Sequence, residues 1–125
     1  MLFRSLGRRV ENRTQQARAQ VIRGDICWYR FRPPDKKRPV LLLTRDSARP
    51  YLNDLTVAPI TTRIRGVPSE VSLVREDGMP QECAINFYHL QTVPKKDLGS
   101  VITHLRPIRM ADVRAALLFA LGFDD

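Results

Sequence analysis

Two apolar stretches, PVLLLT at residues 39–44 and LTVAPITT at residues 55–62, decide the fold. The first is a continuous apolar run, the pattern of a β-strand that is buried on both faces. The second is a strand pattern interrupted by Pro59, which has no amide hydrogen and therefore predicts an edge or a bulge at that point. Both stretches predict short β-strands.

Further strands are expected around these two, at residues 25–31 (DICWYRF), 70–74, 82–87, 90–93 and 100–105, with turn signals at residues 32–37, 63–68, 75–78 and 94–97. Near the end of the chain the period changes to that of one α-helix, with Gly122 as its C-cap and one apolar stripe formed by Met110, Val113, Leu117 and Leu121. Short strands without βαβ alternation, followed by one helix, predict a mainly β fold: a small twisted barrel over residues 21–125.

The chain of 125 residues fits one domain. No apolar run approaches the roughly 18 residues of a membrane-spanning helix. Arginines before Val21 interrupt any secretory hydrophobic region, so a cytoplasmic protein without membrane contact is expected. Cys27 and Cys83 have no CxxC spacing and are expected to be buried thiols in a reducing compartment.

The net charge of +8 is concentrated early in the chain. Residues 1–49 carry 13 Lys and Arg against 4 Asp and Glu, whereas residues 50–125 carry 8 against 9. A basic stretch of this kind attracts phosphate backbones, and an acidic protein equally well. Residues 1–20 hold five arginines and one acid, and we expect them to form a basic extension, flexible or helical, outside the barrel domain.

The usual catalytic and metal-binding templates are missing from the sequence. His89 and His104 stand fifteen positions apart with no HxH or HExxH spacing, so neither a metal nor a cofactor is expected. No nucleophile elbow is present. The two histidines could still act as general acid and base, although a lone strand histidine such as His104 is more often structural.

Arg38 and Thr61 stand in settings that suit phosphate chemistry. Pro39 restricts Arg38 to extended geometry at the entry of a buried strand. A guanidinium held there can grip a phosphate through two donors and neutralise charge that develops on the phosphoryl oxygens. The hydroxyl of Thr61, at a strand end, can face a cleft. The alternatives are a surface arginine lying over an apolar edge and a threonine chosen for strand propensity.

Taken in order, several segments resemble the MazF/PemK toxin family. They are Arg23-Gly24-Asp25 followed by Trp28, RPVLL at residues 38–42, VAPITT at residues 57–62, Val71-Ser72-Leu73 after Pro68, Thr92-Val93 before a lysine-rich turn, and Leu98-Gly99 before the terminal helix. Each motif is weak alone, and their order and spacing over about residues 21–122 carry the resemblance.

The resemblance implies an SH3-like β-barrel of the MazF/PemK/CcdB type with a C-terminal helix, usually a homodimer. It implies a metal-independent endoribonuclease toxin that cuts single-stranded RNA (mRNA, tRNA or rRNA) at specific sequences. Attack by the ribose 2′-hydroxyl would leave 2′,3′-cyclic phosphate and 5′-hydroxyl ends, and a small acidic MazE-like antitoxin would neutralise the toxin. The family's catalytic arginine and threonine fall on Arg38 and Thr61.

Seven further residues are expected to contact RNA: Lys36, Lys37, Thr62, Arg63, Arg65, Tyr88 and His89. Residues 32–37 form a compact RPPDKK loop where many members have a longer one, so the cleavage specificity should differ. At residues 88–89 a Tyr-His pair replaces an acidic residue followed by Gln or Asn, and both rings can stack on bases. The alternative for each of the seven is a surface or groove position without a role.

Two other functions stay open at this point. A gyrase poison of the CcdB type needs C-terminal residues, typically a Trp near the chain end, whereas this chain ends LGFDD. A non-catalytic SH3-like module could use the basic stretch to bind RNA or an acidic protein.

Overall fold

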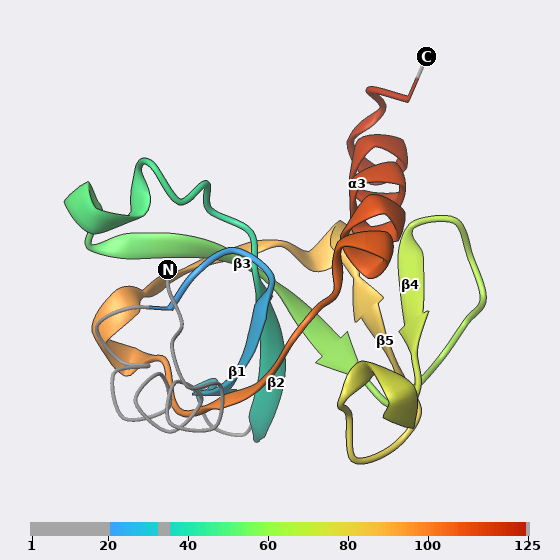
Figure 1. Ribbon diagram of the computed structural model, residues 1–125, viewed down its shortest axis with the longest axis horizontal. Helices are drawn as coiled ribbons and strands as arrows, with labels where there is room; N and C mark the ends of the chain where they lie inside the picture. Colours follow the sequence, from blue (N-terminus) through green and yellow to red (C-terminus); the bar gives the residue numbers. More distant parts are fainter. Residues whose placement is uncertain (1–20, 33–35, 125) are drawn as a thin grey trace.

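The computed structural model describes residues 21–32 and 36–124, so the basic extension and part of the RPPDKK loop lie outside the described residues. The described part is mainly β (Figure 1), as predicted. Its strands are β1 (Asp25–Arg30), β2 (Lys37–Leu42), β3 (Asp54–Thr61), β4 (Glu70–Leu73), β5 (Cys83–Asn86), β6 (Gln91–Pro94) and β7 (Val101–His104), and the helix α3 (Pro107–Leu121) follows them.

The strands form one curled sheet, a half-barrel, in which every pairing is antiparallel. Their order is β4-β5-β3-β2-β1-β7, with β6 also paired to β3. The prediction of an edge or a bulge at Pro59 is wrong, because β3 is a central strand and its register with β2 runs through Pro59 without a shift. Pro59 lies between the last residue paired with β6 and the first paired with β5, where a residue without an amide hydrogen interrupts neither ladder.

The apolar run of β2 contributes to both faces of the sheet, as predicted. Successive strand residues point to opposite faces. Leu41 belongs to the core cluster that α3 covers, together with Ile26, Ala58, Phe87 and Val113. Val40 and Leu42 belong to a second cluster inside the curl of the sheet, with Val57 and Leu98 among its members.

The helix α3 begins at Pro107, three residues before the predicted start. Proline suits the first position of a helix, because the amide hydrogen that it lacks would have no carbonyl partner there. It ends at Gly122, whose positive φ of 81° confirms the predicted C-cap. The predicted apolar stripe is partly wrong. Val113 is buried, but Leu121 is 52% exposed, since the last turn extends beyond the sheet (Figure 1).

The turn predicted at residues 75–78 contains the 3-10 helix η2 (Arg75–Asp77), and the buried carboxylate of Asp77 ties it to α3. Asp77 Oδ1 lies 3.0 Å from Arg106 Nη2 and 3.1 Å from Arg109 Nε, and its Oδ2 accepts a hydrogen bond from the Val74 amide at 2.9 Å. The Asp77 carbonyl accepts another from Thr103 Oγ1 at 3.1 Å. The β4–β5 connection is therefore fastened to the junction of β7 and α3.

Gly78 is required at the end of this turn for two reasons. Its φ of 95° is left-handed, and an added Cβ would lie 2.2 Å from Thr103 Oγ1. We expect Gly78→Ala to lower the free energy of unfolding by about 2 kcal/mol, combining backbone strain with a steric clash. Urea unfolding measures the change.

Gly122→Ala is the matched control for Gly78→Ala. Gly122 also has a positive φ, of 81°, but nothing lies within 4 Å of an added Cβ there. This variant should lose only the backbone contribution, about 1 kcal/mol. Equal losses in the two variants would show that the Thr103 contact contributes nothing.

Both cysteines, Cys27 and Cys83, are buried thiols, as predicted. Within residues 21–32 and 36–124, no helix is both long and apolar enough to cross a membrane.

Candidate active site

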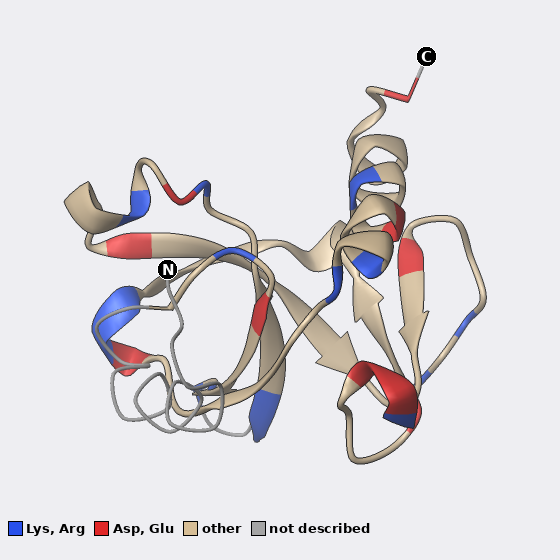
Figure 2. Cartoon of the chain, viewed as in Figure 1, with Lys and Arg blue, Asp and Glu red and all other residues tan. Residues whose placement is uncertain are grey.

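The antiparallel register of β2 and β3 brings Arg38 and Thr61 together. Val40 pairs with Pro59, and continuing this register by two residues sets Arg38 opposite Thr61. Opposed residues of an antiparallel pair point to the same face, with their Cβ atoms about 5 Å apart. Figure 2 shows basic residues at the beginning of β2, on its lower end. The two residues singled out in the sequence therefore lie side by side at one end of the sheet.

A wide cavity of about 810 Å³ opens beside this pair. Its cationic lining residues are Lys36, Lys37, Arg38 and Arg63, and none of the described residues that line it is acidic. An apolar wall completes the cavity, formed by Trp28, Pro39, Ile60, Met79 and Pro80, with Thr61, Thr62, Gln81 and Cys83 also lining it. A basic cavity with an apolar wall suits a phosphodiester with its attached base.

A narrow cavity of about 170 Å³ adjoins the same pair. It shares Arg38, Thr61 and Arg63 with the wide cavity, and its further lining residues are Pro59, Arg65, Glu70, Asn86 and His89. Glu70 is its one acidic lining residue, and Glu70 Oε1 accepts a hydrogen bond from the Arg65 amide at 3.0 Å. Arg38 and Thr61 thus stand where the two cavities meet.

A hydrogen bond and a cation–π contact orient two of the lining side chains. Thr61 Oγ1 accepts a hydrogen bond from the Arg63 amide at 3.0 Å, which engages a lone pair of the oxygen and leaves its proton available for donation. Lys37 Nζ lies 5.1 Å from the centre of the Trp28 ring, a cation–π contact across the β1–β2 pair.

The Cys83 thiol also lines the wide cavity, but its surroundings oppose ionisation. Burial raises the pKa of Cys83 to about 11, and the negative charge of Asp77 adds to the rise. A thiol with this pKa stays protonated at neutral pH and is a poor nucleophile. Among the described residues, moreover, no three His, Cys, Asp or Glu side chains cluster as a metal site.

The comparisons with known proteins agree with this geometry. Residues 22–121 match the family described as PemK-like, MazF-like toxin of type II toxin-antitoxin system. This chain belongs to the PemK/MazF toxin family. The resemblance predicted from the sequence is therefore confirmed.

Relatives of this PemK/MazF-family chain include the endoribonuclease MazF3 of Mycobacterium tuberculosis, 43% identical over 88 residues, which span 70% of this chain and 82% of the relative. The solved Mycobacterium tuberculosis toxin MazF-mt6 is 37% identical, with a TM-score of 0.73 over 81% of this chain and 99% of that one. A mycobacterial endoribonuclease in complex with its cognate antitoxin shares the fold, with a TM-score of 0.74 at 22% identity over 82% of this chain and 96% of that one.

Eight of the nine site residues predicted for this PemK/MazF-family chain line the two cavities: Lys36, Lys37, Arg38, Thr61, Thr62, Arg63, Arg65 and His89. Tyr88 lines neither cavity. Its side chain is 62% exposed, although it neighbours His89 in the 3-10 helix η3 (Phe87–His89).

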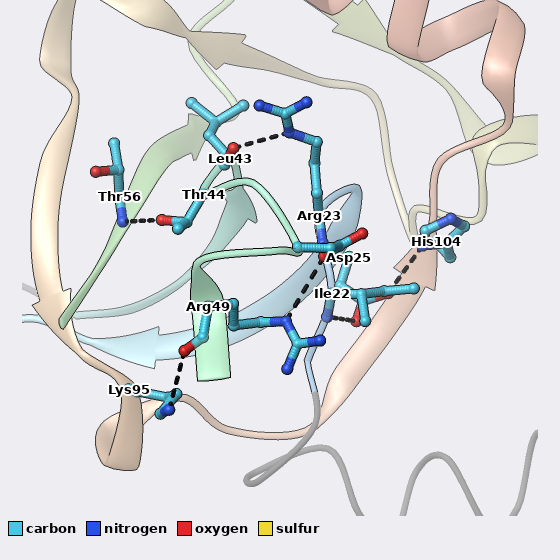
Figure 3. Close-up of polar contacts among 10 residues, drawn as sticks. Ile22, Arg23, Asp25, Leu43, Thr44, Arg49, Thr56, Lys95 and His104 are labelled. Atoms are coloured by element: carbon cyan, nitrogen blue, oxygen red, sulfur yellow. Dashed lines mark hydrogen bonds and ion pairs between the residues drawn. The ribbon is translucent and has the colours of Figure 1, made fainter. Parts of the chain in front are cut away.

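His104 does not join His89 at a common site. His104 Nδ1 lies 2.9 Å from Oδ1 of the buried Asp25, whose Oδ2 accepts a hydrogen bond from the Ile22 amide at 2.9 Å (Figure 3). His104 lines neither cavity that Arg38 and Thr61 share. The structure therefore does not support an acid–base pair of histidines. It supports the interpretation of His104 as a structural residue.

Sequence reasoning missed several lining residues of this PemK/MazF-family site. Trp28 belongs to the family segment that begins at Arg23, but the sequence alone did not predict that it lines a cavity. Asn86 stands three residues before His89, a spacing at which a turn brings two side chains together. Met79, Pro80 and Gln81 reach the wide cavity from the β4–β5 connection, and no local pattern announces that contact.

Proposed function

We propose that this chain, an endoribonuclease toxin of the PemK/MazF family, cuts single-stranded RNA by attack of a ribose 2′-hydroxyl on the adjacent phosphorus, without a metal or cofactor. The observation that carries the proposal is the placement of Arg38 and Thr61 side by side where two cavities meet. The relative MazF3 is named an endoribonuclease. This name favours a catalytic site over a non-catalytic binding module.

The reaction uses a nucleophile that the substrate supplies, so it does not require a metal-bound water. The bond from the 2′ oxygen to phosphorus forms while the bond from phosphorus to the 5′ oxygen breaks. The 2′ oxygen loses its proton and the 5′ oxygen gains one, which leaves a 2′,3′-cyclic phosphate and a 5′-hydroxyl. Negative charge grows on the two non-bridging oxygens, where the planar fork of Arg38 can donate two hydrogen bonds and Thr61 a third.

The surrounding residues suit the binding of RNA on both sides of the scissile phosphate. Lys36, Lys37, Arg63 and Arg65 offer charge to the neighbouring phosphates, and Thr62 offers a hydroxyl. The rings of Trp28, Tyr88 and His89 can stack on bases that are not paired. We therefore infer that single-stranded RNA is the substrate, with mRNA as its cellular source and tRNA or rRNA as alternative sources.

The proposed partners are a small acidic MazE-like antitoxin and a second copy of the chain, in the cytoplasm. An acidic antitoxin would complement the cationic cavities, and the family match is to toxins of toxin–antitoxin systems. Apolar side chains exposed on and after α3, among them Phe119, Leu121 and Phe123, favour burial against a second copy.

Incubation of the protein with a long RNA in EDTA tests the proposed reaction. We expect cuts at discrete positions, with 5′ ends that polynucleotide kinase labels without prior phosphatase treatment, because each end carries a hydroxyl. Matched reactions without EDTA should give the same cuts at a similar rate. Protection of the RNA without cutting, or cutting that stops when EDTA is added, would contradict the proposal.

A further inference from the structure

Asn86 and His89 contact each other at the narrow cavity. Asn86 Nδ2 lies 3.2 Å from His89 Nδ1, and both residues line this cavity with Arg38 and Thr61. We propose that Asn86 is a positioning residue: it fixes the tautomer of His89 so that the ring presents its Nε2–H to a keto-bearing base of the bound RNA. The inference rests on the proposed function, because it names the feature of the substrate that the site reads.

The side-chain amide of Asn86 has one orientation that satisfies its neighbours. Asn86 Oδ1 accepts a hydrogen bond from the backbone amide of Tyr88 at 2.9 Å, at the start of η3. The oxygen end of the amide therefore faces the backbone, and the NH₂ end faces the ring of His89. A side-chain NH₂ group only donates hydrogen bonds.

The orientation of this amide determines which ring nitrogen of His89 carries the hydrogen. His89 Nδ1 faces a donor, so it accepts the hydrogen bond from Asn86. A neutral imidazole has one accepting and one donating nitrogen, so the hydrogen lies on Nε2. His89 consequently offers RNA a hydrogen-bond donor.

A donor at this place distinguishes keto bases from amino bases. Uracil O4 and guanine O6 accept hydrogen bonds, whereas cytosine N4 and adenine N6 donate them. Proteins read such edges on the unstacked bases of single-stranded RNA. Arg38, Arg63 and Arg65 line the same cavity and can hold the backbone, and Oε1 of Glu70 accepts the hydrogen bond from the Arg65 amide. The base beside the scissile phosphate is therefore expected to be uracil or guanine.

The second histidine provides an internal reference for the measurement. His104 Nδ1 lies 2.9 Å from a carboxylate oxygen of Asp25, which accepts, so His104 should carry its hydrogen on Nδ1. The chain has two histidines, and the structure assigns them opposite tautomers. Nitrogen-15 NMR at about pH 8, where an ordinary histidine is neutral, distinguishes the two forms. His89→Gln assigns the signals.

Asn86→Asp is the decisive variant. Aspartate can still accept the hydrogen bond from the Tyr88 amide, but its second oxygen would face the ring as an acceptor. We expect His89 to move from the Nε2–H to the Nδ1–H tautomer, with His104 unchanged. An Nδ1–H ring at His89 in the unmodified protein, or the same tautomer in both proteins, would overturn the assignment of Asn86.

Cleavage of matched RNAs tests the reading of the base. In RNAs that differ only by U→C or G→A beside the cut, the unmodified protein should prefer the keto base about fivefold, the effect of one neutral hydrogen bond. Asn86→Asp should abolish or reverse this preference, because Nε2 would then accept. Equal keto preference in the two proteins would overturn the reading role.

The added charge of the aspartate is controlled in a His89→Gln background. There Asn86→Asp should lower overall cleavage without changing the ratio between keto and amino substrates, because no ring remains whose tautomer can change. A change of that ratio in the absence of His89 would overturn the inference. Absence of cleavage by the unmodified protein would instead overturn the proposed function and the base reading with it, while the ring tautomers would still decide the role of Asn86.

Discussion

Arg38→Ala is expected to lower the rate of RNA cleavage about 100-fold or more, the usual consequence of removing one donor to a charged transition state. Arg38 is exposed at the beginning of β2 and lines both cavities, so its loss removes the charged fork and leaves the core clusters intact. Single-turnover cleavage of a defined RNA measures the effect. Arg38→Lys should cleave RNA at a rate between those of Arg38→Ala and the unmodified protein, because an ammonium keeps the charge without the paired donors.

Arg114→Ala is the matched control for Arg38→Ala. Arg114 is an exposed arginine of α3 that lines neither cavity, and its removal lowers the net charge by the same amount. It should cleave RNA at close to the unmodified rate. Equal rates for Arg38→Ala and Arg114→Ala would refute the assignment of Arg38, even though the family membership would stand.

The proximity of the proposed catalytic pair, Arg38 and Thr61, could be predicted from the sequence because its two members belong to motifs with a fixed order. RPVLL and VAPITT are both strand patterns, and a strand register is all that is needed to bring Arg38 beside Thr61. The mainly β fold followed from the same patterns, since apolar residues on both faces of a run such as 39–44 require two layers of core.

Long-range packing limited the rest of the prediction. Pro59 suggested an edge because its missing amide hydrogen is visible in the sequence, whereas the change of partner from β6 to β5 that accommodates it is not. Leu121 fits the helical stripe, but the sequence does not say that the sheet ends before the last turn of α3. Met79 likewise lines the wide cavity only because the β4–β5 connection folds back toward it.

Asp77→Asn should lower the free energy of unfolding by about 3 kcal/mol, the largest stability effect that we expect of a single charge. The Asp77 carboxylate is 1% exposed and lies within 3.1 Å of nitrogens of both Arg106 and Arg109. Asparagine has the same shape and can still accept the Val74 amide hydrogen bond, but it removes the buried negative charge beside both guanidiniums, of which Arg109 keeps a second carboxylate partner in Asp112, 2.7 Å away. Urea unfolding at neutral pH measures the difference.

Glu76→Gln is the matched control for Asp77→Asn. Glu76 precedes Asp77 in η2 and is exposed, so the same loss of one negative charge should change stability by less than about 0.5 kcal/mol. If the two variants were equally stable, the ion pairs of Asp77 would contribute nothing beyond net charge. The inference that Asp77 holds the β4–β5 connection against α3 would then be wrong.

The pH dependence of the Asp77→Asn effect gives a second measurement with a defined sign. Burial alone would raise the pKa of Asp77, but the Val74 hydrogen bond and the Arg106 and Arg109 guanidiniums outweigh it and hold the pKa below the ordinary 3.8. The folded protein therefore releases this proton more readily than the unfolded chain, so the stabilisation is complete above the unfolded pKa and is lost as the pH falls through the folded pKa. The stability difference between the unmodified protein and Asp77→Asn should be constant above about pH 5 and shrink below pH 3.8. A difference that grew in acid would mean that the pKa of Asp77 is raised on folding, and that burial outweighs its three partners.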